Sequence, residues 1–224
     1  MSSKHIPPRA VVFDLDGTLV DSLPLVLRSI AHAIEPFGPV RPTAEIFARL
    51  GGPPESFMPG LVGEPRHVPA ALERMEAFHR ANHGLIRPFD GAIALLGELR
   101  ARGTTLAIWT GRDRASGVEV LAAHGLTDYF ATVVYGDDLP THKPEPEGLR
   151  EILRRLDVDA RHTIFVGDAD VDVQGGAACA VDTLLIRHTR IIRDEIRALA
   201  HHAVDSPIEA YEWLLARGRP PAAR

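Results

Sequence analysis

The chain has 224 residues, of which 45% are hydrophobic and 25% are charged, and its formal net charge is −5. This composition predicts a globular protein with room for one core and an inserted subdomain. The net negative charge provides no basic surface for nucleic acid, and no apolar run is long enough to span a membrane. We therefore expect a protein that acts on a small molecule, with neither nucleic acid nor a membrane as a partner.

The ends of the chain and its cysteine content predict a cellular location. The segment MSSKHIPPRA lacks the apolar stretch of a secretory signal, and the single Cys179 cannot form an intramolecular disulfide. We expect a cytoplasmic protein that is a monomer or a homodimer. The carboxy-terminal RGRPPAAR is expected to be disordered.

Short runs rich in Val, Ile and Leu alternate with longer amphipathic segments, which predicts a parallel sheet covered by helices. In chain order, the expected strands are 10–15, 105–109, 132–135, 163–166 and 182–186. The expected helices are 92–102, 114–124, 145–156 and 207–215. Apolar Ile93, Leu96 and Leu99 mark the first of these helices, and Gly103 follows its end.

About seventy residues between the first strand and the helix at Ala92 show helical periodicity without a convincing strand. One apolar face would consist of Val26, Ile30, Ala33, Ile34 and Phe37, and a second of Ala70, Ala71, Met75 and Phe78. We therefore predict a core domain of residues 1–20 and 88–224 with an inserted helical cap of residues 21–87. The Gly- and Pro-dense GGPPESFMPG in this cap predicts a turn that approaches a ligand closely.

The stretch AVVFDLDGTLVDS places Asp14 and Asp16 where the first strand ends. Open α/β sheets bind ligands at the carboxyl ends of their strands. Residues i and i+2 of a strand share a face, so both carboxylates could meet one centre, and Gly17 permits an abrupt turn out of the strand.

Other polar residues follow at equivalent places in the chain. LAIWTGRD ends a strand at Thr110 and begins a helix, whose N-terminus suits an anion. THKPEPEGL places Lys143 before a helix, and TIFVGDADVDV ends a strand with Asp168, Asp170 and Asp172. Together these residues predict carboxylate oxygens for Mg²⁺ beside a lysine and a hydroxyl for phosphate. The carboxylates alone would repel phosphate, so the cation and Lys143 must reverse the local charge.

The motifs DLDGT, WTG, HKPEP and GDADVD occur in this order and span nearly the whole chain. With them the chain resembles the haloacid dehalogenase superfamily, in its phosphatase branch with a helical cap. The resemblance implies an α/β fold with a Rossmann-like parallel-sheet core and an inserted α-helical cap. It also implies an enzyme, a phosphoric monoester hydrolase that depends on Mg²⁺.

The resemblance further implies how two carboxylates divide the chemistry. Asp14 would attack phosphorus and become an aspartyl-phosphate. Asp16 would protonate the leaving alcohol and then activate water in the return step.

The remaining motif residues would hold the substrate and the metal. Thr110, the backbone of Gly111 and Lys143 would bind the phosphoryl oxygens. The Mg²⁺ ligands would be Asp14, the Asp16 carbonyl and Asp168, while Asp172 would support metal-bound water or orient Lys143.

Two groups are interpreted without a catalytic role. Asp170 is taken as a cap or turn residue, because the family motif is defined by residues 168 and 172. His79 and His83 have a zinc-compatible spacing but no third ligand, so we interpret them as part of a solvated helix face.

Several reactions of the superfamily can be compared. Asp16 argues against a dehalogenase, and residues 5–142 contain no lysine for a phosphonate-cleaving Schiff base. A sugar-phosphate mutase stays open, but DGTLVDS is more similar to phosphoglycolate phosphatases. A non-catalytic binding protein is disfavoured because all the catalytic groups are present.

The cap offers one candidate for substrate selection. Arg49 ends IFARL just before the Gly- and Pro-rich turn. If it faces the site, its planar guanidinium suits a carboxylate, which favours a small acidic monophosphate such as phosphoglycolate. Nucleotides and sugar phosphates are the alternatives, and a surface arginine is the simpler interpretation.

Overall fold

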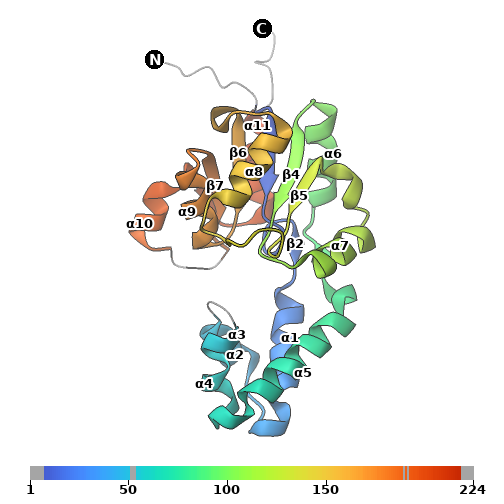
Figure 1. Ribbon diagram of the computed structural model, residues 1–224, viewed down its shortest axis with the longest axis vertical. Helices are drawn as coiled ribbons and strands as arrows, with labels where there is room; N and C mark the ends of the chain where they lie inside the picture. The colour runs from blue at the N-terminus through green and yellow to red at the C-terminus, as the bar shows by residue number, and fades with distance from the viewer. Residues whose placement is uncertain (1–7, 51–53, 189, 191, 218–224) are drawn as a thin grey trace. The chain divides into compact units, whose positions relative to one another are not determined.

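The computed structural model describes residues 8–50, 54–188, 190 and 192–217. These residues form two compact units, one from the described residues of 8–21 and 88–217 and the other from the described residues of 22–87 (Figure 1). Residues 51–53 of the predicted cap turn and residues 218–224 of the predicted tail lie outside the described residues. No helix among the described residues has the length and apolar character that crossing a membrane requires.

A parallel six-stranded sheet organises the first unit, in the order β5-β4-β1-β6-β7-β8. Its strands are β1 (Ala10–Phe13), β4 (Thr105–Trp109), β5 (Thr132–Val134), β6 (Thr163–Gly167), β7 (Asp182–Ile186) and β8 (His202–Val204). Most strand residues are buried, and β1 and β6 are buried throughout, which explains the continuous apolar runs in the sequence. In the register of the central strand, Phe13 lies opposite Ile108 of β4 and Val166 of β6. The carboxyl ends of β1, β4 and β6 therefore meet at one edge.

Helices cover both faces of this sheet (Figure 1). They are α6 (Ala92–Ala101), α7 (Arg114–Ala123), α8 (Glu147–Leu156), α9 (Asp170–Ala178), α10 (Asp194–Leu199) and α11 (Pro207–Arg217), with short 3₁₀ helices η4 (Thr127–Tyr129) and η5 (Ala160–His162). Helices α8 and α9 pack on the face of Trp109, whose indole lies against Gly148 and Gly175. Helices α6 and α11 pack against each other and against β4 and β7.

The predicted α/β class is confirmed, and the five predicted strands form with ends that differ by at most two residues. Several details differ, among them helices α9 and α10, which were not predicted. Strand β8 was not predicted, because its three residues are too few to show periodicity. Helix α8 begins at Glu147 rather than at residue 145, because Pro146 disfavours a helical backbone at the residue before it. The assignment of Ile93 to the apolar face of α6 was wrong, since its side chain is 45% exposed and Leu95 is buried instead.

The second unit is helical. Its elements are α1 (Leu23–Ile34), η1 (Glu35–Phe37), α2 (Thr43–Arg49), α3 (Pro54–Phe57), α4 (Pro59–Val62), η2 (Pro65–His67), α5 (Val68–Ala81) and η3 (His83–Leu85). Two short strands, β2 (Val20–Asp21) and β3 (Arg87–Pro88), stand before and after these helices in the chain. Helices α1 and α5 pack together, and Ile30, Ile34 and Ala71 belong to the core of this unit. The expected burial of Ala70 was wrong, because that residue is exposed.

Candidate active site

A pocket of about 380 Å³ lies at the carboxyl ends of β1, β4 and β6. Seven residues that the sequence singled out line it: Asp14, Asp16, Thr110, Gly111, Lys143, Asp168 and Asp172. Six of them follow a strand or open a helix at the same edge of the sheet, and Lys143 lies in the loop between β5 and α8, so parallel topology brings together residues that are far apart in the chain.

Lys143 is the central cation of this pocket. Its Nζ donates hydrogen bonds of 2.7 Å to Asp14 Oδ1 and 2.7 Å to Asp172 Oδ1. The same Nζ lies 5.1 Å from the Trp109 ring centroid and 5.3 Å from that of Phe165. Burial disfavours the charged amine, but the two carboxylates outweigh burial and raise the pKa of Lys143. The lysine is therefore charged and fixed beside Asp14.

Three carboxylates form a cluster that could hold a divalent cation. Asp14, Asp168 and Asp172 each present an oxygen, and these oxygens lie within 4.8 Å of one another. Burial raises the pKa of Asp14 well above its usual range, with Lys143 opposing that shift. Burial and the nearby Asp172 raise the pKa of Asp168 to about 7. Buried hard oxygens with too little positive charge around them fit a divalent metal ion.

Asp172 is held by the backbone at the start of α9. Its Oδ2 accepts hydrogen bonds from the backbone N–H of Asp168 (3.1 Å) and of Ala169 (2.9 Å), while its Oδ1 faces Lys143. The side chain is 1% exposed. This geometry supports the expectation that Asp172 orients Lys143.

The loop after β1 is anchored by distant parts of the chain. Gly17 has φ +77°, and a Cβ there would lie 2.5 Å from Asp168 Oδ2, so the position excludes any side chain. The Gly17 carbonyl lies 2.7 Å from His188 Nε2, and the Thr18 carbonyl accepts a 2.6 Å hydrogen bond from the Tyr211 hydroxyl. Sequence reasoning had missed His188 and Tyr211, which lie far from the motifs.

Arg112 is a further pocket residue that sequence reasoning had missed. Its Nε donates 2.9 Å to Asp16 Oδ2, its Nη2 donates to Asp16 Oδ1, and its Nη1 donates 2.7 Å to Ser116 Oγ. Burial works against this charge, but the attraction of Asp16 outweighs it and raises the pKa of Arg112. The available signal was its position, directly after WTG at a strand end.

Thr110 and Asp170 have different surroundings. Thr110 is 2% exposed, and its Oγ1 accepts a 3.1 Å hydrogen bond from the backbone N–H of Arg112. Asp170 does not line the pocket and pairs with Arg193 at 3.2 Å.

Arg49 belongs to the helical unit. Its Nη2 lies 3.7 Å from Glu45 Oε1, and its side chain is 46% exposed. This pair spans one turn of α2 and leaves the side chain about half exposed to solvent.

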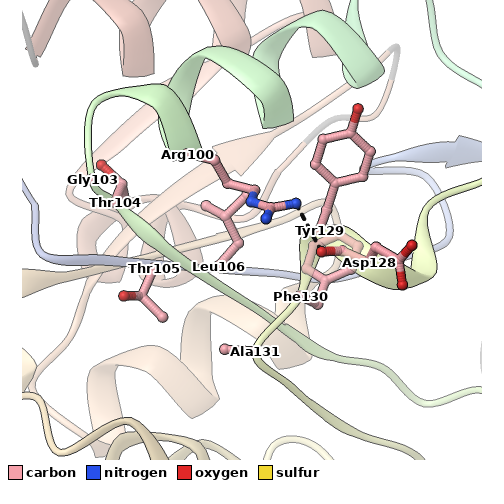
Figure 2. A pocket seen from close by; sticks show the side chains of 9 residues that line it. All are labelled: Arg100, Gly103, Thr104, Thr105, Leu106, Asp128, Tyr129, Phe130 and Ala131. Carbon is pink, nitrogen blue, oxygen red and sulfur yellow. Dashed lines mark hydrogen bonds between the residues drawn. The ribbon is translucent and has the colours of Figure 1, made fainter.

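A second pocket, of about 310 Å³, lies at the amino end of β4 (Figure 2). Arg100 Nη1 donates 2.8 Å to the Asp128 carbonyl there, and the guanidinium lies 5.6 Å from the Tyr129 ring centroid. The two pockets thus occupy opposite ends of β4, and the second contains no carboxylate cluster.

Comparisons with known proteins agree with this geometry. A family model described as haloacid dehalogenase-like hydrolase matches residues 11–186. A protein named phosphoglycolate phosphatase, plasmid, from Cupriavidus necator is 33% identical, with 98% of each chain covered. The pyrophosphatase PpaX of Halalkalibacterium halodurans is 31% identical, covering 84% of this chain and 87% of that protein. The crystal structure of a predicted phosphoglycolate phosphatase from Haemophilus somnus 129PT has a TM-score of 0.79 at 20% identity, covering 92% of this chain and 97% of that one.

Proposed function

The chain belongs to the haloacid dehalogenase-like hydrolase family, and on that premise we propose that it is a Mg²⁺-dependent phosphatase of a small phosphorylated metabolite. The observation that carries the proposal is the contact of Asp14 with Lys143 beside the carboxylates of Asp168 and Asp172. A nucleophile, a phosphate-binding cation and hard metal ligands thus share one pocket.

Asp14 is the proposed nucleophile. Its carboxylate oxygen attacks phosphorus, and the bond from phosphorus to the leaving oxygen breaks to give an aspartyl-phosphate. Asp16 gives its proton to the leaving oxygen and later takes one from the water that attacks the aspartyl-phosphate. That second attack breaks the bond between phosphorus and Asp14 and releases inorganic phosphate.

The other pocket residues stabilise charge. Lys143, the Thr110 hydroxyl and the Gly111 backbone lie where they can bind phosphoryl oxygens. Asp14, Asp168 and the Asp16 carbonyl would hold Mg²⁺, which supplies electrostatic stabilisation of the transferring phosphoryl group. Asp172 would contribute by fixing Lys143, and its Oδ1 belongs to the same cluster.

The proposed substrate is a carboxylate-bearing monophosphate such as 2-phosphoglycolate. Support comes from the relative named phosphoglycolate phosphatase, which aligns over 98% of this chain. Arg49 is the candidate carboxylate ligand from the cap. Inorganic pyrophosphate is a second candidate, since the PpaX pyrophosphatase aligns over 84% of the chain. A sugar-phosphate mutase would need an aspartyl-phosphate that resists water.

The test is kcat/KM for 2-phosphoglycolate, pyrophosphate, glycerol phosphate, a hexose phosphate and a nucleoside monophosphate, with Mg²⁺ or with EDTA. We expect 2-phosphoglycolate to lead, release of phosphate to require Mg²⁺, and Ca²⁺ to inhibit because its coordination sphere is larger and looser. Asp14→Asn, purified in parallel, controls for contaminating phosphatases. Full turnover after chelation would contradict the metal requirement, and a hexose phosphate isomerised without phosphate release would indicate the mutase.

A further inference from the structure

The ion pair between Arg112 and Asp16 is a feature that the proposed reaction does not use in its present form. Both oxygens of Asp16 accept from the guanidinium of Arg112. A carboxyl group that donates a proton to a leaving oxygen must turn its O–H toward that oxygen and is no longer an anion, so it binds both arms of the guanidinium much more weakly than a carboxylate does. When Asp16 acts as an acid, it therefore gives up most of its attraction to Arg112.

Arg112 is built to keep its position when that happens. Its side chain is 9% exposed, and Nη1 is tied to Ser116 on α7. The backbone N–H of Arg112 is fixed by Thr110 in the same pocket. A guanidinium held in this way and deprived of Asp16 would be a buried charge without a counter-ion, which is strongly unfavourable. Release of Asp16 therefore requires another anion in its place.

We propose that Arg112 binds the carboxylate of the substrate's leaving group, and that this carboxylate displaces Asp16 from the guanidinium. This inference rests on the proposed function and adds a carboxylate ligand from the core unit. Because one carboxylate replaces another, the guanidinium of Arg112 keeps its bidentate pair of hydrogen bonds.

The size of the substrate follows from this exchange. Asp16 must reach the bridging oxygen of the substrate while Arg112, its present partner, holds the substrate's carboxylate. The bridging oxygen and the carboxylate must then be close together. In 2-phosphoglycolate a single carbon separates the bridging oxygen from the carboxylate carbon, whereas longer acids would place the carboxylate beyond the pair. Lys143, the other permanently charged cation of the pocket, is already engaged by Asp14 and Asp172.

The experiment compares wild type, Arg112→Gln, Arg112→Lys and Arg150→Gln. Arg150 provides a matched loss of charge, because it is 59% exposed on α8 and does not line the pocket. The substrates are 2-phosphoglycolate, 2-hydroxyethyl phosphate, which replaces the carboxylate with CH₂OH, and p-nitrophenyl phosphate. Unfolding temperatures confirm that each variant is folded, and Arg112→Lys keeps the charge if Arg112→Gln does not fold.

We expect Arg112→Gln to lower kcat/KM for 2-phosphoglycolate by about 100-fold, mainly through KM, as for a lost charge-assisted pair. For p-nitrophenyl phosphate, whose leaving group needs no proton, kcat/KM should change by less than about 5-fold. For 2-hydroxyethyl phosphate it should not fall, because Arg112→Gln frees Asp16 from its ion pair. Arg112→Lys should be intermediate on 2-phosphoglycolate, since a lysine keeps the charge but not the fork. Arg150→Gln should match wild type throughout. An equal loss on all three substrates, or an unchanged preference for 2-phosphoglycolate, would overturn the inference.

A binding measurement separates this inference from the proposed function. Glycolate carries the carboxylate without a phosphate, and titration calorimetry should show that Arg112→Gln weakens glycolate binding at least about 10-fold while inorganic phosphate binds nearly as before. If wild type hydrolyses none of the phosphates but shows this difference, the proposed function fails and the carboxylate site stands. If it hydrolyses 2-phosphoglycolate while glycolate binds both proteins equally, the inference fails and the phosphatase stands.

Discussion

Replacing Lys143 by methionine should destabilise the core unit strongly in the absence of metal. Methionine keeps much of the length and packing of the lysine but removes the ammonium group that donates to both Asp14 and Asp172 at 2.7 Å. These carboxylates are 6% and 1% exposed, so water cannot replace the amine. Removing one partner of a buried ion pair costs about 3–5 kcal/mol. For a domain of this size that corresponds to a fall in Tm of roughly 10 °C.

The assay is thermal unfolding at pH 7.5 in EDTA and in Mg²⁺, with Arg150→Met as the surface control. Mg²⁺ should raise the Tm of Lys143→Met more than that of wild type, because the cation supplies positive charge that the variant lacks. The control should stay within about 0.5 kcal/mol of wild type. If Lys143→Met matches the control in EDTA, or if Mg²⁺ stabilises wild type more, the account of this site as a balance of buried charges is refuted.

Other substitutions test individual roles. Asp14→Asn should lower kcat by at least about 10³-fold with the Tm retained, and activity within tenfold of wild type would contradict the nucleophile. Asp16→Asn should lose more activity on an alkyl phosphate than on p-nitrophenyl phosphate, since only the alkanol needs a proton to leave; equal losses would exclude the general acid. In EDTA the Tm should fall between about pH 4 and pH 7, because the pKa of Asp168 is raised to about 7 in the folded protein against ~3.9 unfolded. The stability that this proton provides is complete below the unfolded pKa and is lost as the pH rises through about 7, so Asp168→Asn should flatten the profile. If Arg49 binds the substrate carboxylate, Arg49→Ala should lower the ratio of kcat/KM for 2-phosphoglycolate to that for glycerol phosphate about 10-fold. An unchanged ratio would remove Arg49 from the site.

The sheet and most of its site could be predicted because each depends on local patterns. Buried parallel strands appear in the sequence as runs of β-branched residues, and most of the motif residues follow directly after those runs. Parallel topology then places Asp14, Thr110 and Asp168 at one edge whatever the detailed packing. The strands and the edge of the sheet at which the motif residues gather depend only on chain order and strand direction, so both could be predicted from the sequence.

The contacts between side chains needed the structure. The partner of Arg112 is Asp16, 96 positions earlier, and only the adjacency of β1 and β4 brings the two together. His188 and Tyr211 hold the loop after β1 across 171 and 193 positions, without any local sequence pattern that marks them. Residue-by-residue burial also depends on the neighbouring element, as exposed Ile93 on α6 shows.

The charges of the pocket explain why metal, lysine and substrate depend on one another. Four carboxylates, Asp14, Asp16, Asp168 and Asp172, line the pocket together with two permanent cations, Lys143 and Arg112. With all six ionised, the pocket carries two uncompensated negative charges, and the raised pKa of Asp14 and of Asp168 reflects burial together with this repulsion. A divalent cation would bring the balance to zero and leave Asp14 ionised as a nucleophile. A substrate carboxylate on Arg112 would then free Asp16 from its ion pair, so that the carboxyl group of Asp16 can carry the proton for the leaving oxygen only once a substrate of the right charge is in place.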